Sequence, residues 1–209
     1  MADPIRVLLV EDQPLTRLGV RAVIAQQPDI EIAGEEDNSV GGFGKFKELR
    51  PAVTILGLRL RDSCTIDDLD NYFIADPKAK IIVLAEHAGD AEITKALKKG
   101  ALGYICKDIS PEDLVSAIRT VSKGRKFIPA DVAAILSEHI GSEELTTAEA
   151  NILRMIVGGM SNKEIAFALD ISENTVKTHA SNIYDKLGVS DRTSAATLAI
   201  KRGLVRTDL

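Results

Sequence analysis

Residues 161–187, SNKEIAFALDISENTVKTHASNIYDKL, restrict the fold more than any other stretch because they predict two short helices joined by a tight turn. Ser161 lies three residues before Glu164, the spacing of a capping box, and therefore predicts the start of the first helix. Residues 170–171 provide the turn, and Ser172 is suited to cap the second helix. Apolar residues recur along the second helix at spacings of four, three and four, so one face of it should be buried. They are Val176, Ala180, Ile183 and Leu187.

The opposite face of the second helix is polar. It carries Asn174, Lys177, Thr178 and Ser181. Short or cationic side chains of this kind can donate hydrogen bonds to base edges and to phosphates in a major groove. A polar face on the second helix of such a pair is what reading a DNA duplex requires. The stretch therefore predicts a recognition helix, with double-stranded DNA as its partner.

Two further helices are predicted on either side of this pair. Thr146 and Glu149 form a second capping box and start a supporting helix. Ser190 is placed to cap a fourth helix over residues 191–202. Glycines close the helices of this region: Gly158, Gly159, Gly188 and Gly203. Four helices in so short a segment predict a compact all-α helix-turn-helix domain.

These residues resemble the LuxR-type helix-turn-helix, which is found at the C-terminus of response regulators of the NarL/FixJ class. The matching residues are Leu145, Thr146, Glu149, Gly158, Asn162, Lys163, Glu164, Ile165, Ala166, Leu169, Ser172, Thr175, Val176, Lys177, His179, Ile183, Lys186, Leu187 and Arg192. The resemblance implies groove contacts by Lys177, Thr178 and Ser181. It implies phosphate contacts or helix–helix bonds for Lys163, Thr175, Lys186 and Arg192. His179 either contacts the DNA backbone or is a packed or capping residue.

The resemblance also implies that two DNA-binding domains pair through their last helix. Small residues there, Ala195, Ala196 and Ala199, would let two such helices approach closely. Two-fold pairing predicts a homodimer and an inverted repeat in the target DNA.

The chain as a whole has 209 residues and a 45% hydrophobic content, which suits two packed domains. We expect a receiver-like domain at residues 1–123, a partly helical linker at 124–142 and the helix-turn-helix domain at 143–209. The net charge is −5, and residues 141–209 hold eight Lys and Arg against nine Asp and Glu, so charge alone does not indicate nucleic acid. No apolar run reaches membrane-spanning length, and the two cysteines form no disulfide framework. We therefore expect a cytoplasmic protein with reduced thiols and no membrane contact.

The first 123 residues alternate strand and helix patterns, which predicts a five-stranded doubly wound parallel sheet of the flavodoxin or receiver type. The expected strands are 5–10, 30–33, 53–56, 81–84 and 104–106. The expected helices are 15–26, 40–49, 66–75, 91–99 and 111–123. Gly41, Gly42 and Gly44 predict that the second helix is short, bent or mobile, because glycine weakens a helix interior. Apolar residues at Val132, Ile135 and Leu136 predict a helix over 131–139 within the linker.

This part of the chain resembles the receiver domain, the phosphoryl-accepting input module of response regulators. The matching residues are Val10, Glu11, Asp12, Gly100, Ala101, Gly103, Tyr104, Lys107 and Asp108. The resemblance also exposes departures at the carboxyl edge of the sheet, where ligands of such folds bind. The phosphoryl-accepting aspartate is replaced by Gly57, which has no nucleophile, and the hydroxyl residue after the fourth strand by Ala85, which cannot donate. Residues 58–62 lack the usual Pro and Gly. These departures predict a receiver that works without phosphorylation.

The remaining residues of that edge have plain expected roles. Glu11 and Asp12 would hold Mg²⁺ in the family, but two carboxylates without a phosphoryl group form a weak site. We expect a surface acidic pair partly neutralised by Lys107, with no metal and no cofactor. Tyr104 should be a packed or interface aromatic. Asp62, the nearest replacement carboxylate, should be a solvated loop acid.

The sequence therefore predicts a sequence-specific transcription regulator that is not an enzyme. Its activity would be set by dimerisation, expression level, a protein partner or a ligand. One alternative is a phosphorylation-dependent two-component regulator with a non-standard acceptor such as Asp62. Another is an interaction protein that binds a partner regulator and does not read DNA.

Overall fold

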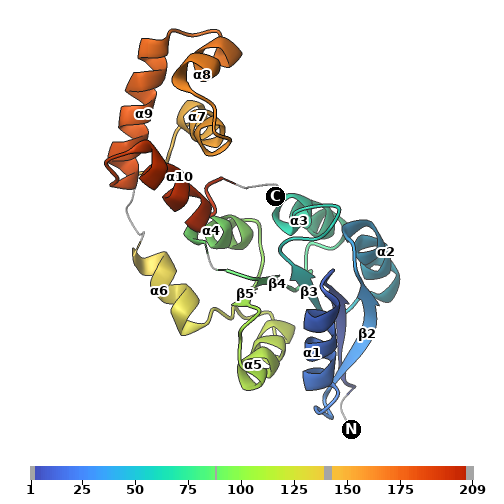
Figure 1. Cartoon of the computed structure of the whole chain (residues 1–209). Helices are drawn as coiled ribbons and strands as arrows, with labels where there is room; N and C mark the ends of the chain where they lie inside the picture. Colours follow the sequence, from blue (N-terminus) through green and yellow to red (C-terminus); the bar gives the residue numbers. More distant parts are fainter. Residues whose placement is uncertain (1–2, 88, 139–142, 206–209) are drawn as a thin grey trace. The chain divides into compact units, whose positions relative to one another are not determined.

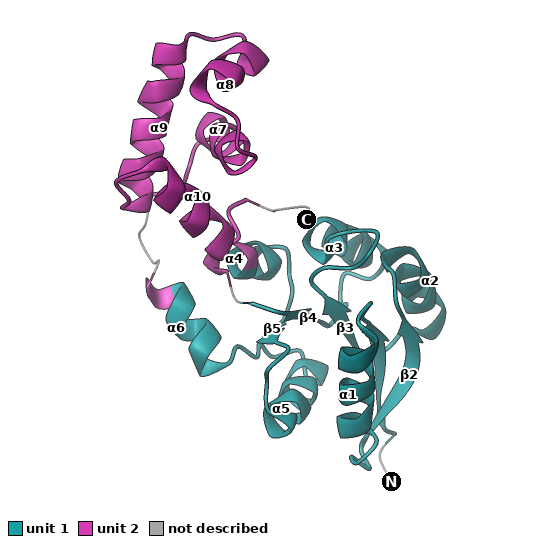
Figure 2. Ribbon diagram, in the orientation of Figure 1, with its two compact units in different colours: residues 1–88, 93–136 teal, residues 89–92, 137–209 magenta. Residues whose placement is uncertain are grey.

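The computed structural model describes residues 3–87, 89–138 and 143–205. The chain divides into two compact units, one of residues 1–88 and 93–136 and the other of residues 89–92 and 137–209 (Figure 2). We describe each unit by itself, with the element labels of Figure 1.

The first unit contains a parallel sheet with the strand order β2-β1-β3-β4-β5, as its described residues show (Figure 1). The strands are β1 (Ile5–Val10), β2 (Ile30–Glu36), β3 (Val53–Gly57), β4 (Ile81–Ala85) and β5 (Gly103–Cys106). The order steps outward from β1 in both directions, which is the doubly wound arrangement. The predicted five-stranded α/β fold is confirmed.

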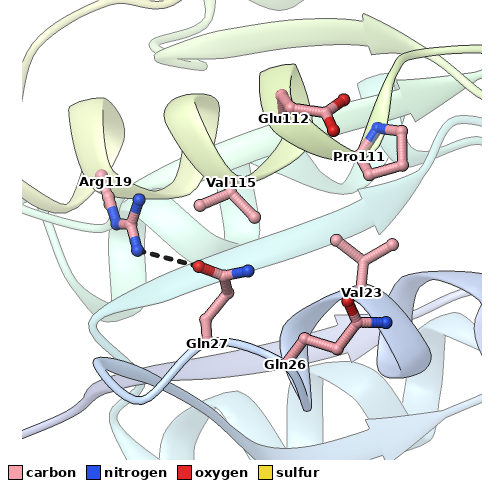
Figure 3. Close-up of a pocket in the computed structure, with 7 residues that line it drawn as sticks. All are labelled: Val23, Gln26, Gln27, Pro111, Glu112, Val115 and Arg119. Carbon is pink, nitrogen blue, oxygen red and sulfur yellow. Dashed lines mark hydrogen bonds between the residues drawn. The ribbon is translucent and has the colours of Figure 1, made fainter.

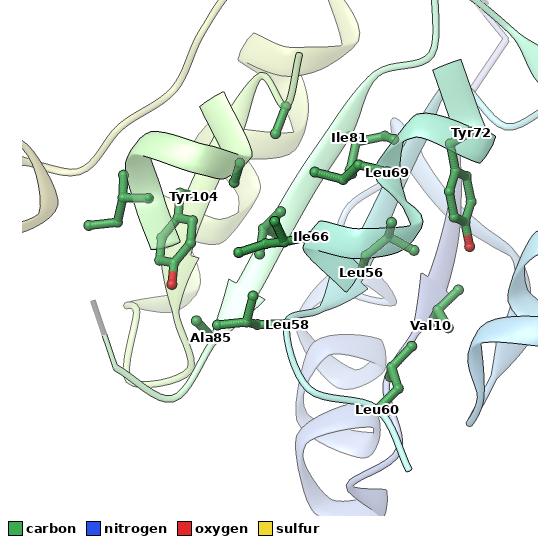
Figure 4. Packing of buried hydrophobic residues seen from close by; sticks show 14 of the residues in the cluster. Val10, Leu56, Leu58, Leu60, Ile66, Leu69, Tyr72, Ile81, Ala85 and Tyr104 are labelled. Carbon is green, nitrogen blue, oxygen red and sulfur yellow. The ribbon is translucent and has the colours of Figure 1, made fainter. Parts of the chain in front are cut away.

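Helices cover both faces of this sheet. They are α1 (Pro14–Ile24), α2 (Ser39–Leu49), α3 (Thr65–Ala75), α4 (Asp90–Lys98), α5 (Pro111–Ser122) and α6 (Ala130–Glu138). Alternate residues along each strand point to opposite faces, so the core forms two clusters. The cluster of Val7, Leu9 and Ile55 packs against α1 and α5. The cluster of Leu8, Val10 and Leu56 packs against α2, α3 and α4, and Figure 4 shows part of it.

The expected linker helix forms as α6, and its apolar residues belong to the core of the first unit. Val132 is fully buried in the second of these clusters, and Ile135 and Leu136 pack against it. The predicted end of that helix, residue 139, lies outside the described residues.

The prediction that α2 is short is wrong, because this helix runs over 11 residues despite its glycines. Asn38 caps it by accepting a hydrogen bond from the Gly41 N–H. A Cβ on Gly42 would lie 2.7 Å from a methyl carbon of Val10, so glycine is what allows α2 to approach β1. Packing against the sheet therefore outweighs the weak helix propensity of the glycines.

The second unit is helical in its described C-terminal part. Its helices are α7 (Thr147–Val157), α8 (Asn162–Leu169), α9 (Glu173–Leu187) and α10 (Arg192–Lys201). One apolar cluster joins all four, with Ile152, Ile165, Ile183 and Ala199 buried in it. The predicted helix-turn-helix domain is confirmed as a fold.

The helix starts agree with the sequence in three of the four cases. Both capping boxes form, at Thr146 with Glu149 and at Ser161 with Glu164. Ser172 caps α9, and the chain turns before it through Asp170, whose φ is 53°. The fourth prediction is wrong, because Ser190 does not cap α10. Asp191 does so, accepting from the Ser194 N–H at 2.9 Å, and a carboxylate suits the positive end of a helix better than a hydroxyl.

Candidate nucleic-acid interface and strand-end site

The α9 helix has one buried apolar face and one exposed polar face, as the sequence predicts. Val176, Ala180, Ile183 and Leu187 are buried in the core of the second unit. The polar side chains of the opposite face are all exposed: Asn174, Lys177, Thr178 and Ser181. The Thr178 hydroxyl donates to the Asn174 carbonyl at 3.0 Å, so its methyl group is what it can offer outward. The helix thus presents an amide, an ammonium, a methyl and a hydroxyl group to solvent.

Lys186 and Arg192 hold the helices of this domain together. The Lys186 ammonium donates to the Glu149 carboxylate at 2.9 Å, linking α9 to α7. The Arg192 guanidinium donates to the carbonyl oxygens of Met160 and Ile156, and so ties the start of α10 to the end of α7 and the segment after it. Of the two roles that the resemblance left open for these residues, the structure places both in helix–helix bonds.

Lys163 and Thr175 are in a different position, because both are exposed near the starts of α8 and α9. The Thr175 N–H donates to the capping hydroxyl of Ser172 at 3.1 Å, and the two hydroxyl groups lie 2.8 Å apart. Lys163 leaves a positive charge at the surface in the first turn of α8.

Glu149 is the buried anion of this domain, with 4% of its surface exposed. Its carboxylate accepts from Lys186 and from both the N–H and the hydroxyl of Thr146. The hydrogen bond from Lys186, aided by those from Thr146, lowers the pKa of Glu149 below its usual value. The carboxylate therefore stays charged at neutral pH.

His179 is packed. The residue is half-buried, and its Nδ1 atom is buried with no hydrogen-bond partner among the described residues. Of the roles that the sequence left open for it, the packed one agrees with this position.

The three alanines of α10 do not form an outward-facing surface. Ala195 and Ala199 are fully buried in the core of the second unit, and Ala196 packs against it. The sequence interpretation that placed them between two protomers is therefore wrong, because their small size serves contacts within the domain. The exposed residues of α10 are Thr193, Thr197, Ile200 and Lys201.

The carboxyl edge of the sheet brings together the residues that the receiver resemblance selected. Glu11 follows β1, Gly57 ends β3, Ala85 ends β4 and Lys107 follows β5. Gly57 pairs with Leu84, and the Lys107 N–H donates to the Ala85 carbonyl at 2.7 Å. Parallel strands that end at one edge account for this grouping.

Glu11 is not the surface residue that the sequence predicts, because its side chain is fully buried. Its Oε1 atom accepts from Lys107 Nζ at 2.9 Å and from the Gln13 N–H at 3.0 Å. Its Oε2 atom is buried and has no hydrogen-bond partner within the described residues. Burial raises the pKa of the Glu11 carboxyl, against the opposing effect of Lys107. The expected pairing with Lys107 is confirmed, whereas the expected exposure holds only in part for Asp12, which is half-buried.

The residues at this edge do not make a Mg²⁺ site. Mg²⁺ requires near-octahedral oxygen ligands and keeps several waters. In the part of the chain that the structure describes, no group of three or more His, Cys, Asp or Glu side chains is placed to hold a metal ion. Position 57 holds no carboxylate, and Glu11 Oε1 already accepts from Lys107, so the donor set fits Mg²⁺ poorly.

Tyr104 and Asp62 complete this region. Tyr104 is fully buried in the cluster that also holds Ala85 (Figure 4), and its hydroxyl donates to the His87 carbonyl at 3.2 Å, so the packed role is confirmed. Asp62 is exposed, but it is more than a solvated acid. Its two carboxylate oxygens accept from the Ser39 N–H at 2.9 and 3.0 Å, and one also accepts from the Val40 N–H at 3.3 Å. Asp62 therefore satisfies the start of α2.

Two residues near the site, Arg17 and Gln13, make contacts that the sequence does not predict. The Arg17 guanidinium donates to the backbone carbonyl of Glu11, and the Gln13 amide donates to the Glu86 carboxylate. Both bonds join residues on separate elements or loops, and no local pattern in the sequence marks them.

A surface pocket of about 400 Å³ lies between the end of α1 and α5 (Figure 3). Its lining residues are Val23, Gln26, Gln27, Pro111, Glu112, Val115 and Arg119. Within the lining, the Arg119 guanidinium donates a hydrogen bond to the Gln27 side-chain oxygen at 3.0 Å. None of these residues belongs to the carboxyl edge of the sheet. Among the described residues, no helix is both long and apolar enough to span a bilayer.

Comparison with known proteins agrees with both halves of this description. Residues 7–119 match the family model of the response regulator receiver domain, and residues 143–199 match that of bacterial regulatory proteins of the luxR family. The chain belongs to the response-regulator family. It is a DNA-binding transcription regulator with a luxR-type helix-turn-helix domain, of the kind found in two-component systems.

Several relatives match nearly the whole of this response regulator. It is 33% identical to the uncharacterized transcriptional regulatory protein YxjL of Bacillus subtilis, over 98% of this chain and 99% of the relative. It is 34% identical to the transcriptional regulatory protein MctR of Rhizobium johnstonii, over 96% and 95%. It is 33% identical to the response regulator VraR of Staphylococcus aureus, over 97% and 99%.

Solved structures are similar over the same length. The complex of the two-component response regulator RcsB with DNA has a TM-score of 0.75 at 25% identity, over 95% of this chain and 99% of that one. RcsB of Salmonella enterica serovar Typhimurium, bound to a promoter in the presence of the phosphomimetic BeF₃⁻, has a TM-score of 0.76 at 25% identity over the same shares. The response regulator ChrA of a heme-sensing system has a TM-score of 0.58 at 29% identity, over 97% and 100%.

Proposed function

We propose that this response regulator reads specific DNA sequences with the outer face of α9 and does so without aspartyl phosphorylation. The observation that carries the proposal is the exposure of Asn174, Lys177, Thr178 and Ser181 on a helix whose other face is buried. Lys177 suits guanine acceptors, the Thr178 methyl suits thymine, and Ser181 suits either kind of base edge. Lys163 and Thr175 are placed to contact phosphates, and Asn174 adds an amide beside them.

Phosphorylation independence is the second part of the proposal. Gly57 offers no nucleophile at the end of β3, and Ala85 offers no hydroxyl at the end of β4. Asp62, the example of a non-standard acceptor in the phosphorylation-dependent alternative, already accepts from two N–H groups of α2. The phosphomimetic BeF₃⁻ was present in a structure of RcsB, and this observation concerns RcsB and not the present chain. Dimerisation, expression level, a protein partner or a ligand would set activity here, and we expect no catalytic role.

The active species that we propose is a homodimer on an inverted repeat. Because Ala195 and Ala199 are buried, the pairing surface has to use the exposed face of α10, where Thr193, Thr197 and Ile200 recur at helical spacing. A two-fold axis through such a surface would present two α9 helices to two half-sites.

We also propose the division into a receiver-like domain at 1–123, a linker at 124–142 and a DNA-binding domain at 143–209. The limits of the two family matches support it. The burial of Val132 supports counting part of that linker with the receiver-like domain.

The test is to select genomic fragments that the purified protein binds, and then to measure how tightly substituted variants bind the same fragments. We expect Lys177→Ala and Ser181→Ala each to weaken binding to the selected operator about 5- to 100-fold, the range of one or two good base contacts. Arg154→Ala, at an exposed cation on α7, is the matched control and should bind like the natural protein. Unchanged operator binding in both α9 variants would contradict readout by α9, and absence of operator binding in the natural protein would favour the partner-binding alternative.

A further inference from the structure

The Glu11 carboxylate lies where a side chain at position 57 would begin. A Cβ built on Gly57 would be 2.6 Å from Glu11 Oε2 and 3.3 Å from Glu11 Cδ. Carbon atoms of this kind do not approach an oxygen so closely in folded proteins. Any residue other than glycine at position 57 must therefore displace this carboxylate.

Several contacts hold the Glu11 carboxylate in that place. Lys107 Nζ and the Gln13 N–H both donate to Oε1, and Arg17 fixes the backbone by donating to the Glu11 carbonyl. The side chain is fully buried, so displacement breaks a charge pair that water does not readily replace. Without these contacts, the flexible end of the Glu11 side chain would move aside at little cost in free energy.

The same contacts occupy Lys107. Its side chain is only 15% exposed, and its ammonium nitrogen lies 2.9 Å from the Glu11 carboxylate. An incoming anion could use this ammonium group only by breaking the existing pair. The other oxygen, Oε2, is buried and is the atom that faces Gly57.

We propose that Glu11 is an internal plug of the strand-end site. Its carboxylate fills the space of the missing side chain at position 57 and neutralises Lys107, which closes the site to a phosphoryl group and to Mg²⁺. This inference rests on the proposed phosphorylation independence and adds its cause: glycine is required at position 57 because Glu11 is turned inward. An aspartate restored at position 57 alone would not rebuild an acceptor site.

The test is a double-mutant cycle in the full-length protein, with the melting temperature of the receiver-like domain measured by calorimetry. We expect Gly57→Ala alone to lower the melting temperature by about 4 °C or more. In a Glu11→Asp background, where the carboxylate is withdrawn by one methylene, Gly57→Ala should cost less than half of that loss. Gly19→Ala, where an added Cβ meets nothing within 4 Å, is the control and should be independent of Glu11. Equal losses in both backgrounds would overturn the proposal.

A second measurement decides the matter if Glu11→Asp does not fold. A crystal structure of the Gly57→Ala variant should show the Glu11 carboxylate moved away from Lys107. A carboxylate that stays in place beside the new methyl group would contradict the plug. A rise in the melting temperature of the natural protein with Mg²⁺ and beryllofluoride would contradict the closed site.

Different experimental results would contradict the plug and the proposed function. Additive losses in the stability cycle overturn the plug and leave DNA binding untouched. Absence of operator binding in the natural protein contradicts the proposed function and leaves the stability cycle as it is.

Discussion

At the scale of single residues, Glu149 shows how one buried carboxylate stabilises two elements. It completes the capping box with Thr146 at the start of α7 and accepts from Lys186 on α9. The sequence predicts the capping box because its partners are three residues apart. The contact with Lys186 crosses 37 residues, and only the folded domain reveals it.

The lowered pKa of Glu149 makes the stability of the DNA-binding domain depend on pH. A depressed carboxyl pKa contributes stability that is present above the ordinary value of 4.5 and is lost as pH falls through the folded value. We expect Glu149→Gln to destabilise this domain by about 1–3 kcal/mol at pH 7 and to flatten its stability profile in the acid range. Urea unfolding followed by circular dichroism between about pH 3 and pH 7 measures both effects. Glu143→Gln, at an exposed position, is the control, and an unchanged slope in Glu149→Gln would refute the assignment.

At the scale of elements, α2 shows packing overriding propensity. Three glycines weaken this helix, yet it forms fully because Gly42 lets it approach β1 and Asn38 caps it. The same helix also donates hydrogen bonds to a residue outside it, since the N–H groups of Ser39 and Val40 donate to the Asp62 carboxylate. These supports come from three different segments.

Two glycines of α2 should therefore respond in opposite ways to alanine. A Cβ at Gly42 would lie 2.7 Å from Val10, whereas one at Gly44 would meet nothing within 4 Å. We expect Gly44→Ala to raise the free energy of unfolding by about 0.5–1 kcal/mol, through helix propensity alone. Gly42→Ala should lower it by about 1–3 kcal/mol through overpacking. Thermal melts of the two variants measure both changes. A Gly42→Ala variant that is more stable than the natural protein would contradict the close approach of α2 to β1.

Much of the element order was predictable, since continuous apolar runs mark the buried strands. β2 was predicted too short because it is an edge strand, and its last residues, Gly34 to Glu36, carry no apolar pattern. At the site, the replacement residues Gly57 and Ala85 were visible in the sequence. The burial of Glu11 was not, because it depends on Lys107, 96 residues away.

At the scale of the whole molecule, the chain combines a receiver-like unit without an acceptor side chain at residue 57 with a DNA-binding unit that we propose acts as a homodimer. The DNA-binding region has almost balanced charge, so one subunit offers few cations for phosphate contacts. Pairing would double those contacts and make binding both tighter and more dependent on salt.

The exposed face of α10 should carry that pairing. We expect Ile200→Asp, which puts a charge on a side chain that is 45% exposed, to weaken self-association at least about 10-fold. Sedimentation equilibrium measures this, and operator affinity should fall in parallel. Ala168→Asp, at an exposed position of α8, is the matched control. A natural protein that is monomeric on its operator would rule out pairing through α10.

The most direct test of the central claim is footprinting of the purified protein on genomic DNA, with no phosphodonor present and again with Mg²⁺ and beryllofluoride. We expect the same protected sites, at affinities equal within about 2-fold, under both conditions. Protection that appears only with beryllofluoride, or strengthens more than about 10-fold, would contradict it.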